Sequence, residues 1–247
     1  MSNLYKSNMR RLSRNPLFIG GLALAFLATL AFTSNMIGMT GRFAAIDNEK
    51  RMFFISIAMM GFFTVFVPVF SNVEYGNGVI RNKIVAGYSI KQVFYSHLLT
   101  HISALFLMSV VYMIAGILGG ARISGAMLLK NAVLFFALCA YISALMLLAI
   151  RVKRAVVLIG YAFLILMFSY SVVMIGNALL SFVLKGSAKT FGTIIYNMIA
   201  FGQWFSNTWI GVDEINPGNI AQLAISTGMI LIQMLIGTFR LNRRDLK

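Results

Sequence analysis

Acidic residues are scarce in this chain of 247 residues, which has six Asp and Glu against 21 Lys and Arg. Charged residues make up only 11% of the chain and hydrophobic residues 60%, whereas soluble proteins have about 25% charged residues. Six carboxylates are too few to solvate a globule of this size. The composition therefore excludes a soluble domain and indicates an integral membrane protein.

Cysteine is almost absent as well. The single cysteine, Cys139, lies in an apolar run. One cysteine excludes an intrachain disulfide, and nothing in the sequence suggests a redox framework.

Long apolar runs are what the sequence has in abundance. A hydrocarbon core of about 30 Å takes roughly 20 helical residues, and six runs reach that length. They cover residues 16–36, 52–70, 93–118, 131–150, 155–175 and 219–237. The sequence therefore predicts an all-α integral membrane protein, with one six-span domain over residues 16–247.

The basic residues fall mostly on one side of these spans. The loops of that side, with both termini, carry 14 bases and two acids, and the other side carries seven bases and four acids. Because basic loops stay in the cytoplasm, we expect both termini inside a cell (plasma) membrane, as in bacteria. The net charge of +15 is then explained by topology and lipid headgroups, so nucleic acid is not an expected partner.

The spans lack the groups that most chemistry needs. They contain no Asp, Glu, Lys or Arg, which argues against an ion-coupled carrier. Phosphate-loop, zinc-protease and serine-hydrolase motifs are missing, so we expect no enzymatic activity, cofactor or metal on this chain. His97 and His101, one helical turn apart, suit hydrogen bonding better than a metal or proton role, and both readings stay open.

The first 15 residues predict a short amphipathic helix. Leu4, Tyr5, Met9 and Leu12 recur at helical spacing and basic residues occupy the other faces, until Pro16 breaks the pattern. We expect this helix in the membrane interface, and a basic tail that only fixes the topology is the alternative.

The segment between the second and third spans predicts a second short helix. Ser71 and Glu74 have capping-box spacing, and Ser89 and Gln92 repeat it at the start of the third span. We therefore expect a helix over residues 72–86 with a stop at Gly87. Glycines at 76 and 78 cost helix stability and suggest close approach by another backbone.

The outer segment 185–218 is the longest stretch between spans. Its apolar part, residues 191–205, is too short to span and too apolar for a free loop, so a re-entrant or interfacial helix is expected. Trp204 and Trp209 are predicted at the outer headgroups, as parts of a gate or as plain anchors. On the first span, Gly21, Ala25 and Thr29 form a small-residue stripe suited to helix packing.

Residues after the second span resemble the signature found there in membrane subunits of type-2 ABC exporters. The match comprises Glu74, Gly78, Arg81 and Asn82, followed by Gly87, Ser89 and Tyr95, while Ile90 departs from the Arg expected there. The order of helices and spans is similar as well, although the motif covers only about 25 residues.

The resemblance implies a permease subunit whose helix 72–86 is a coupling helix for a separate ABC ATPase. ATP and Mg would be bound by that ATPase, and a second permease copy, identical or a close paralogue, would complete the pathway. The outer segment would be a re-entrant gate. The expected substrate is hydrophobic or amphipathic, such as a membrane-active peptide or toxin; a non-transporting sensor or scaffold, or an exporter of drugs or lipid-linked glycans, is the alternative.

Overall fold

The computed structural model describes residues 2–36, 38, 45–76, 78–152, 154–208, 210–211 and 215–239. All regular structure in this part of the chain is helical, which confirms the predicted fold class. Six helices are long and apolar enough to cross a membrane, so the chain is a multi-pass membrane protein.

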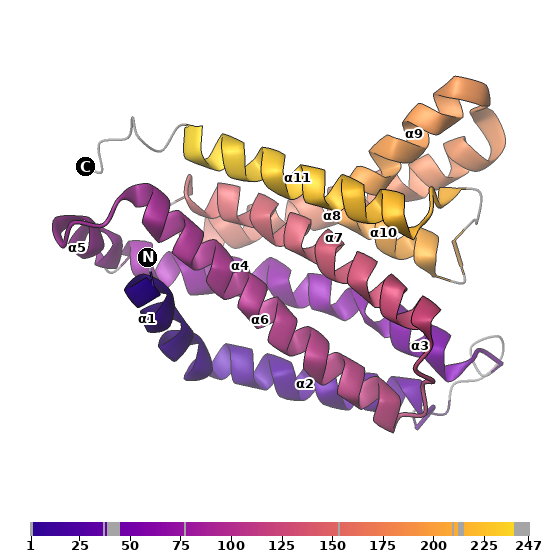
Figure 1. Cartoon of the computed structure of the whole chain (residues 1–247), viewed down its shortest axis with the longest axis horizontal. Helices are drawn as coiled ribbons and strands as arrows, with labels where there is room; N and C mark the ends of the chain where they lie inside the picture. Colours follow the sequence, from indigo (N-terminus) through magenta and orange to yellow (C-terminus); the bar gives the residue numbers. More distant parts are fainter. Residues whose placement is uncertain are drawn as a thin grey trace.

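The six candidate spans lie roughly along one direction (Figure 1). They are α2 (Pro16–Thr33), α3 with α4 (Asn48–Ile55 and Ile57–Gly76), α6 (Ile90–Leu118), α7 (Gly125–Ala149), α8 with the π-helical turn η2 (Ala155–Ala178 and Leu179–Val183), and α11 (Asn219–Phe239). The predicted runs coincide with these helices, and most of the helices extend beyond the apolar run into polar residues.

Short helices gather at the two ends of this bundle. Helices α1 (Ser2–Ser13) and α5 (Val79–Val85) lie at one end, which we call the α5 end (Figure 1). Helices α9 (Gly186–Met198) and α10 (Ala200–Asn207) lie with α3 at the opposite end, which we call the α10 end. By the distribution of basic residues, the α5 end is predicted to be cytoplasmic.

The core of the bundle lies around α4 and α7. In the most apolar window of α7 67% of the residues are buried, against 17% in the windows of α8 and α11. The Phe- and Met-rich second span packs inside this core, where Phe63, Phe66 and Phe70 are fully buried. By contrast, α8 and α11 expose apolar side chains such as Phe168, Leu235 and Phe239.

The small-residue stripe of α2 faces the rest of the bundle. A Cβ atom on Gly21 would overlap the ring of Phe62 in α4, and Thr29 is buried. Ala25 packs against the core at partial burial. Small side chains at these positions thus allow α2 to approach α4 and α6 closely.

Candidate functional site

The segment after the second span folds differently from the expected single helix. Helix α4 continues without interruption to Gly76, and α5 covers only Val79–Val85 instead of residues 72–86. Ser71 therefore lies inside α4 and caps no helix: its Oγ lies 3.1 Å from His101 Nε2. Both Ser71 and Glu74 are buried, because their side chains turn toward α6. The second capping box, Ser89 with Gln92, is confirmed.

Gly78 has a conformational role in this turn. It precedes α5 with φ 66°, in the left-handed region that residues with a Cβ atom rarely adopt. A Cβ atom there would meet nothing within 4 Å. Among the described residues no backbone approaches Gly78 closely, and the glycine permits a sharp reversal of the chain. Gly87, with φ 90°, ends the segment as expected.

Glu74 is the centre of a buried charged cluster. Its carboxylate accepts hydrogen bonds from Arg11 of α1, from Lys83 Nζ of α5 at 2.5 Å and from His97 Nε2 of α6 at 2.7 Å. The Glu74 side chain is only 5% exposed and that of Lys83 13%. We call Arg11, Glu74, Lys83 and His97 the Glu74 cluster. It joins α1, α4, α5 and α6 through one carboxylate.

Neighbouring polar groups extend the Glu74 cluster. Arg11 also donates to the carbonyl oxygen of Phe70 at 2.5 Å, and its guanidinium carbon lies 3.7 Å from the centre of the Phe70 ring. Asn8 donates to Ser96 Oγ at 3.0 Å and accepts from Lys83 at 3.4 Å. The amphipathic helix α1 is therefore fixed to α6 by polar contacts as well as by its apolar residues Leu4 and Leu12.

The surroundings of Glu74 keep it ionised. Burial alone would raise its pKa, but the hydrogen bonds and charges of His97, Lys83 and Arg11 outweigh burial and lower the pKa from 4.5 to about 2. A carboxylate held in this way carries its negative charge throughout the physiological pH range.

Helix α5 is buried on one face and exposed on the other. Ile80 is buried against Leu4 of α1 and Val93 of α6, and Lys83 reaches Glu74. The opposite face exposes Arg81, Asn82 and Val85. Of the four residues predicted to contact an ATPase, Gly78, Arg81 and Asn82 are exposed, whereas Glu74 is 4% exposed and fixes α5 from inside.

The outer segment forms two helices, in keeping with the outer helices expected between the fifth and sixth spans. Helices α9 and α10 meet at Ile199, and every residue of α10 from Phe201 to Asn207 is buried. Trp204, 5% exposed, packs on Phe54 and Phe201 and donates its indole N–H to the Phe53 carbonyl oxygen at 3.3 Å. Trp204 therefore packs against other residues of this chain and joins α10 to α3. Trp209 lies outside the described residues.

Neutral amides hold this end of the bundle. Gln222 of α11, fully buried, donates to Asn197 Oδ1 at 2.8 Å and to Ser206 Oγ at 2.9 Å, and accepts from Asn207 Nδ2 at 2.7 Å. Gln203 accepts from Ser226 at 2.9 Å. We call Asn197, Gln203, Ser206, Asn207, Gln222 and Ser226 the amide network. It connects α9, α10 and α11 without any charge.

Neither the Glu74 cluster nor the amide network was predicted from the sequence. Glu74 and His97 are 23 residues apart and Arg11 and Glu74 are 63 apart, so no local spacing relates them. Within the described residues, no group of three His, Cys, Asp or Glu side chains has the geometry to hold a metal ion. His97 and His101 are both in hydrogen-bond contact through Nε2, which is the hydrogen-bonding role favoured for them.

Comparisons with known proteins identify no relative of this chain. No family model, no curated protein and no solved structure matches the chain. What is established is therefore the class: a multi-pass, all-α membrane protein with six candidate spans.

Proposed function

We propose that this chain is the membrane subunit of an ATP-driven exporter, and that α5 is the element on which a separate ABC ATPase acts. The observation that carries the proposal is the two-sided attachment of α5. Its outer face exposes Arg81 and Asn82, and its inner face reaches the buried Glu74 through Lys83.

This attachment would transmit movement to the spans. Breaking a buried ion pair by separating one partner costs about 3–5 kcal/mol. A displacement of α5 therefore moves Glu74 at the end of α4 and His97 at the start of α6 before it breaks the Glu74 cluster. Two spans and the amphipathic helix α1 would respond together to one push on the exposed face.

The proposal also names the partners and the substrate of this chain. ATP and Mg would be bound by the partner ATPase. The apolar faces of α8 and α11 would meet lipid or a second permease copy across the pathway. Apolar pathway walls suit a hydrophobic or amphipathic substrate, and a membrane-active peptide or toxin is the substrate class that we propose.

Affinity purification from native membranes tests the attachment. With the wild-type chain, an ABC ATPase is expected to co-purify. Arg81→Glu should reduce its recovery at least about tenfold, because reversing a partly desolvated interface charge costs about 2 kcal/mol or more. The matched control is Arg154→Glu, an exposed arginine of another loop on the same predicted side.

Three outcomes of this purification count against the proposal. Equal recovery of the ATPase with Arg81→Glu and with Arg154→Glu would show that α5 is not the contact. Recovery of a kinase in place of the ATPase would favour a sensor. Absence of any ATPase would remove the exporter reading altogether.

The predicted orientation has its own test. In a chain whose Cys139 is replaced by Ser, a cysteine at Asn82 should react with a membrane-impermeant thiol reagent only after the membrane is opened. A cysteine at Ser187, exposed in the first turn of α9, should react in intact cells. The reverse pattern would place α5 outside, where no ATPase is available.

A further inference from the structure

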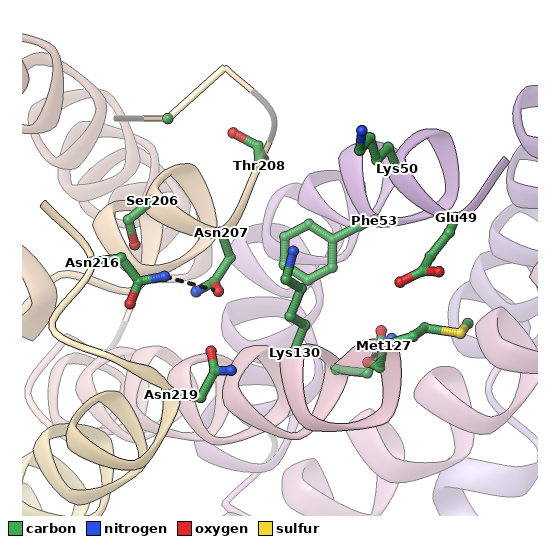
Figure 2. Close-up of a pocket in the computed structure, with 12 residues that line it drawn as sticks. Glu49, Lys50, Phe53, Met127, Lys130, Ser206, Asn207, Thr208, Asn216 and Asn219 are labelled. Carbon is green, nitrogen blue, oxygen red and sulfur yellow. Dashed lines mark hydrogen bonds between the residues drawn. The ribbon is translucent and has the colours of Figure 1, made fainter. Parts of the chain in front are cut away.

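The α10 end contains a polar cavity of about 510 Å³. It lies between α3, α7, α10 and the start of α11, and Figure 2 shows side chains from all four elements around it. Its lining includes two lysines, a glutamate and four asparagines, whereas binding cavities for drug-sized molecules are mostly apolar. A ligand for this cavity must therefore be polar or charged.

The cavity lies at the depth of lipid headgroups. Glu49 and Phe53 belong to the first two turns of α3, Met127 and Asn131 to the first two turns of α7, and Asn219 begins α11. Each of these helices begins a candidate span. At 1.5 Å per residue, the lining residues lie within about 10 Å of the span ends. Headgroup layers occupy about 5–8 Å on each side of the hydrocarbon core.

Charges of both signs line the cavity and are not paired with each other. Lys130 of α7 is half-buried and makes no hydrogen bond or ion pair with any described residue. Glu49 of α3 accepts only a long hydrogen bond, 3.5 Å, from Ser124 among the described residues. Figure 2 shows both side chains reaching toward the cavity from different helices. A single ligand with one group of each sign would satisfy both.

The asparagines of the lining are less available to a ligand than its charged side chains. The side-chain oxygens of Asn131 and Asn219 have no hydrogen-bond partner among the described residues, but they are buried and do not face the cavity. Asn207 and Asn216 already bond to each other at 3.3 Å. The ligand is therefore selected by Lys130 and Glu49.

We propose that this cavity binds the headgroup of a membrane phospholipid that has a primary ammonium next to its phosphate, as in phosphatidylethanolamine. Lys130 binds the phosphate, and Glu49 accepts hydrogen bonds from the ammonium. A choline headgroup has no N–H to donate. A purely anionic headgroup would satisfy Lys130 and leave Glu49 unpaired.

A lipid is favoured over a peptide as the source of this chemistry by the depth of the cavity. The N-terminus of a peptide offers an ammonium as well, but lipid headgroups are the most abundant molecules at this depth. Exposed apolar side chains next to the cavity, Leu128 and Leu129 of α7 and Ile220 of α11, provide a surface for the acyl chains. The proposal is independent of any ATPase.

Native mass spectrometry of the detergent-solubilised full chain tests the proposal. The protein is mixed with equal amounts of phosphatidylethanolamine, phosphatidylcholine and phosphatidylglycerol. We expect phosphatidylethanolamine to be retained about tenfold more than the other two, the effect of one charge-assisted hydrogen bond. Lys130→Gln and Glu49→Gln should each remove this preference, and Lys185→Gln, an exposed lysine of the outer segment, should not.

The same measurement contains the results that would overturn the proposal. Equal retention of the three lipids by the wild type, or an unchanged preference in both cavity variants, would show that the cavity does not select this headgroup. Soluble glycerophosphoethanolamine or tetraglycine bound as tightly as the lipid would assign the site to a soluble ligand. A melting temperature like that of the wild type shows that each variant is folded, and Lys130→Arg, which keeps the charge, should restore the preference.

Discussion

The two ends of this bundle both bury polar side chains, but they hold them in different ways. At the α5 end, one carboxylate, Glu74, accepts hydrogen bonds from the side chains of Arg11, Lys83 and His97. At the α10 end, Gln222 and its neighbours form a network in which every group is neutral. The polar contacts of the α5 end depend on one residue, whereas those of the α10 end are distributed over several side chains.

This difference sets how easily each end can rearrange. Separating buried charges costs about 3–5 kcal/mol, and all contacts of the Glu74 cluster meet at the same carboxylate. Exchanging one neutral hydrogen bond for another changes the energy by about 0.5–1.5 kcal/mol, so the amide network can open in small steps. The α5 end is therefore suited to move as a rigid unit, and the α10 end is suited to change shape, as the proposed coupling element and gate would require.

The largest effect is expected from Glu74→Gln. Removing the carboxylate leaves the half-buried Arg11 and Lys83 without a counter-charge, so the free energy of unfolding should fall by up to about 3 kcal/mol. Denaturant titration of the purified protein in detergent measures this loss. Asp47→Asn is the control, because the Asp47–Lys50 pair is exposed and worth about 0–1 kcal/mol. Equal losses in the two variants would mean that the Glu74 cluster does not hold the α5 end.

Acid should weaken the Glu74 cluster and leave the amide network unchanged. The pKa of Glu74 is about 2 in the folded chain and ordinarily 4.5. Its contribution is therefore complete above pH 4.5 and is lost as the pH falls toward 2. Buried His97 and His101 also bind protons when the chain unfolds at low pH, so the share of Glu74 is the difference between the wild-type and Glu74→Gln curves. Stability measured from pH 6 to pH 2.5 should fall steeply in the wild type and much less in Glu74→Gln; parallel curves would contradict the assignment.

The fold was predictable because membrane spans are recognised by length and apolarity alone. All six runs correspond to helices, and the capping box of Ser89 and Gln92 marks the start of α6. Ser71 and Glu74 have the same spacing and cap nothing. The local pattern is identical, and what differs is burial: these two side chains have partners on α6, and these partners let α4 continue.

The candidate sites were less accessible to sequence reasoning because their contacts join distant segments. Exposed Arg81 and Asn82 belong to one short helix and were found from a local pattern. The partners of Glu74 come from three other helices, and Trp204 bonds to a carbonyl oxygen 151 residues away. Tryptophan between spans is typical of a headgroup anchor, and that pattern gives no sign of the contacts that Trp204 makes with α3.

A smaller, pH-independent effect is expected at the α10 end. Gln222→Met keeps a similar volume but leaves Asn197 Oδ1 and Asn207 with fewer hydrogen-bond partners, which should lower the free energy of unfolding by about 2 kcal/mol. The loss should be the same at pH 6 and at pH 3. Thr227→Val, an exposed position of the same helix, should change stability by less than about 0.5 kcal/mol. A loss that varied with pH would mean that a charged group contributes to the amide network.

The smallest effect is expected halfway between the ends, where packing alone acts. In α2 two adjacent glycines differ in one respect: a Cβ atom on Gly21 would overlap the Phe62 ring, and one on Gly20 would meet nothing within 4 Å. Ala in place of Gly stabilises a helix interior by about 1 kcal/mol, and overpacking a core position costs about 1–3 kcal/mol. Gly20→Ala should therefore stabilise the protein slightly, and Gly21→Ala should be neutral or destabilising by about 1 kcal/mol. Thermal unfolding of the two variants measures the difference directly, since the helix contribution is common to both. If Gly21→Ala proved as stable as Gly20→Ala, the close approach of α2 to α4 would be absent. The stability losses at the two ends of the bundle could then no longer be compared with the effect of packing alone.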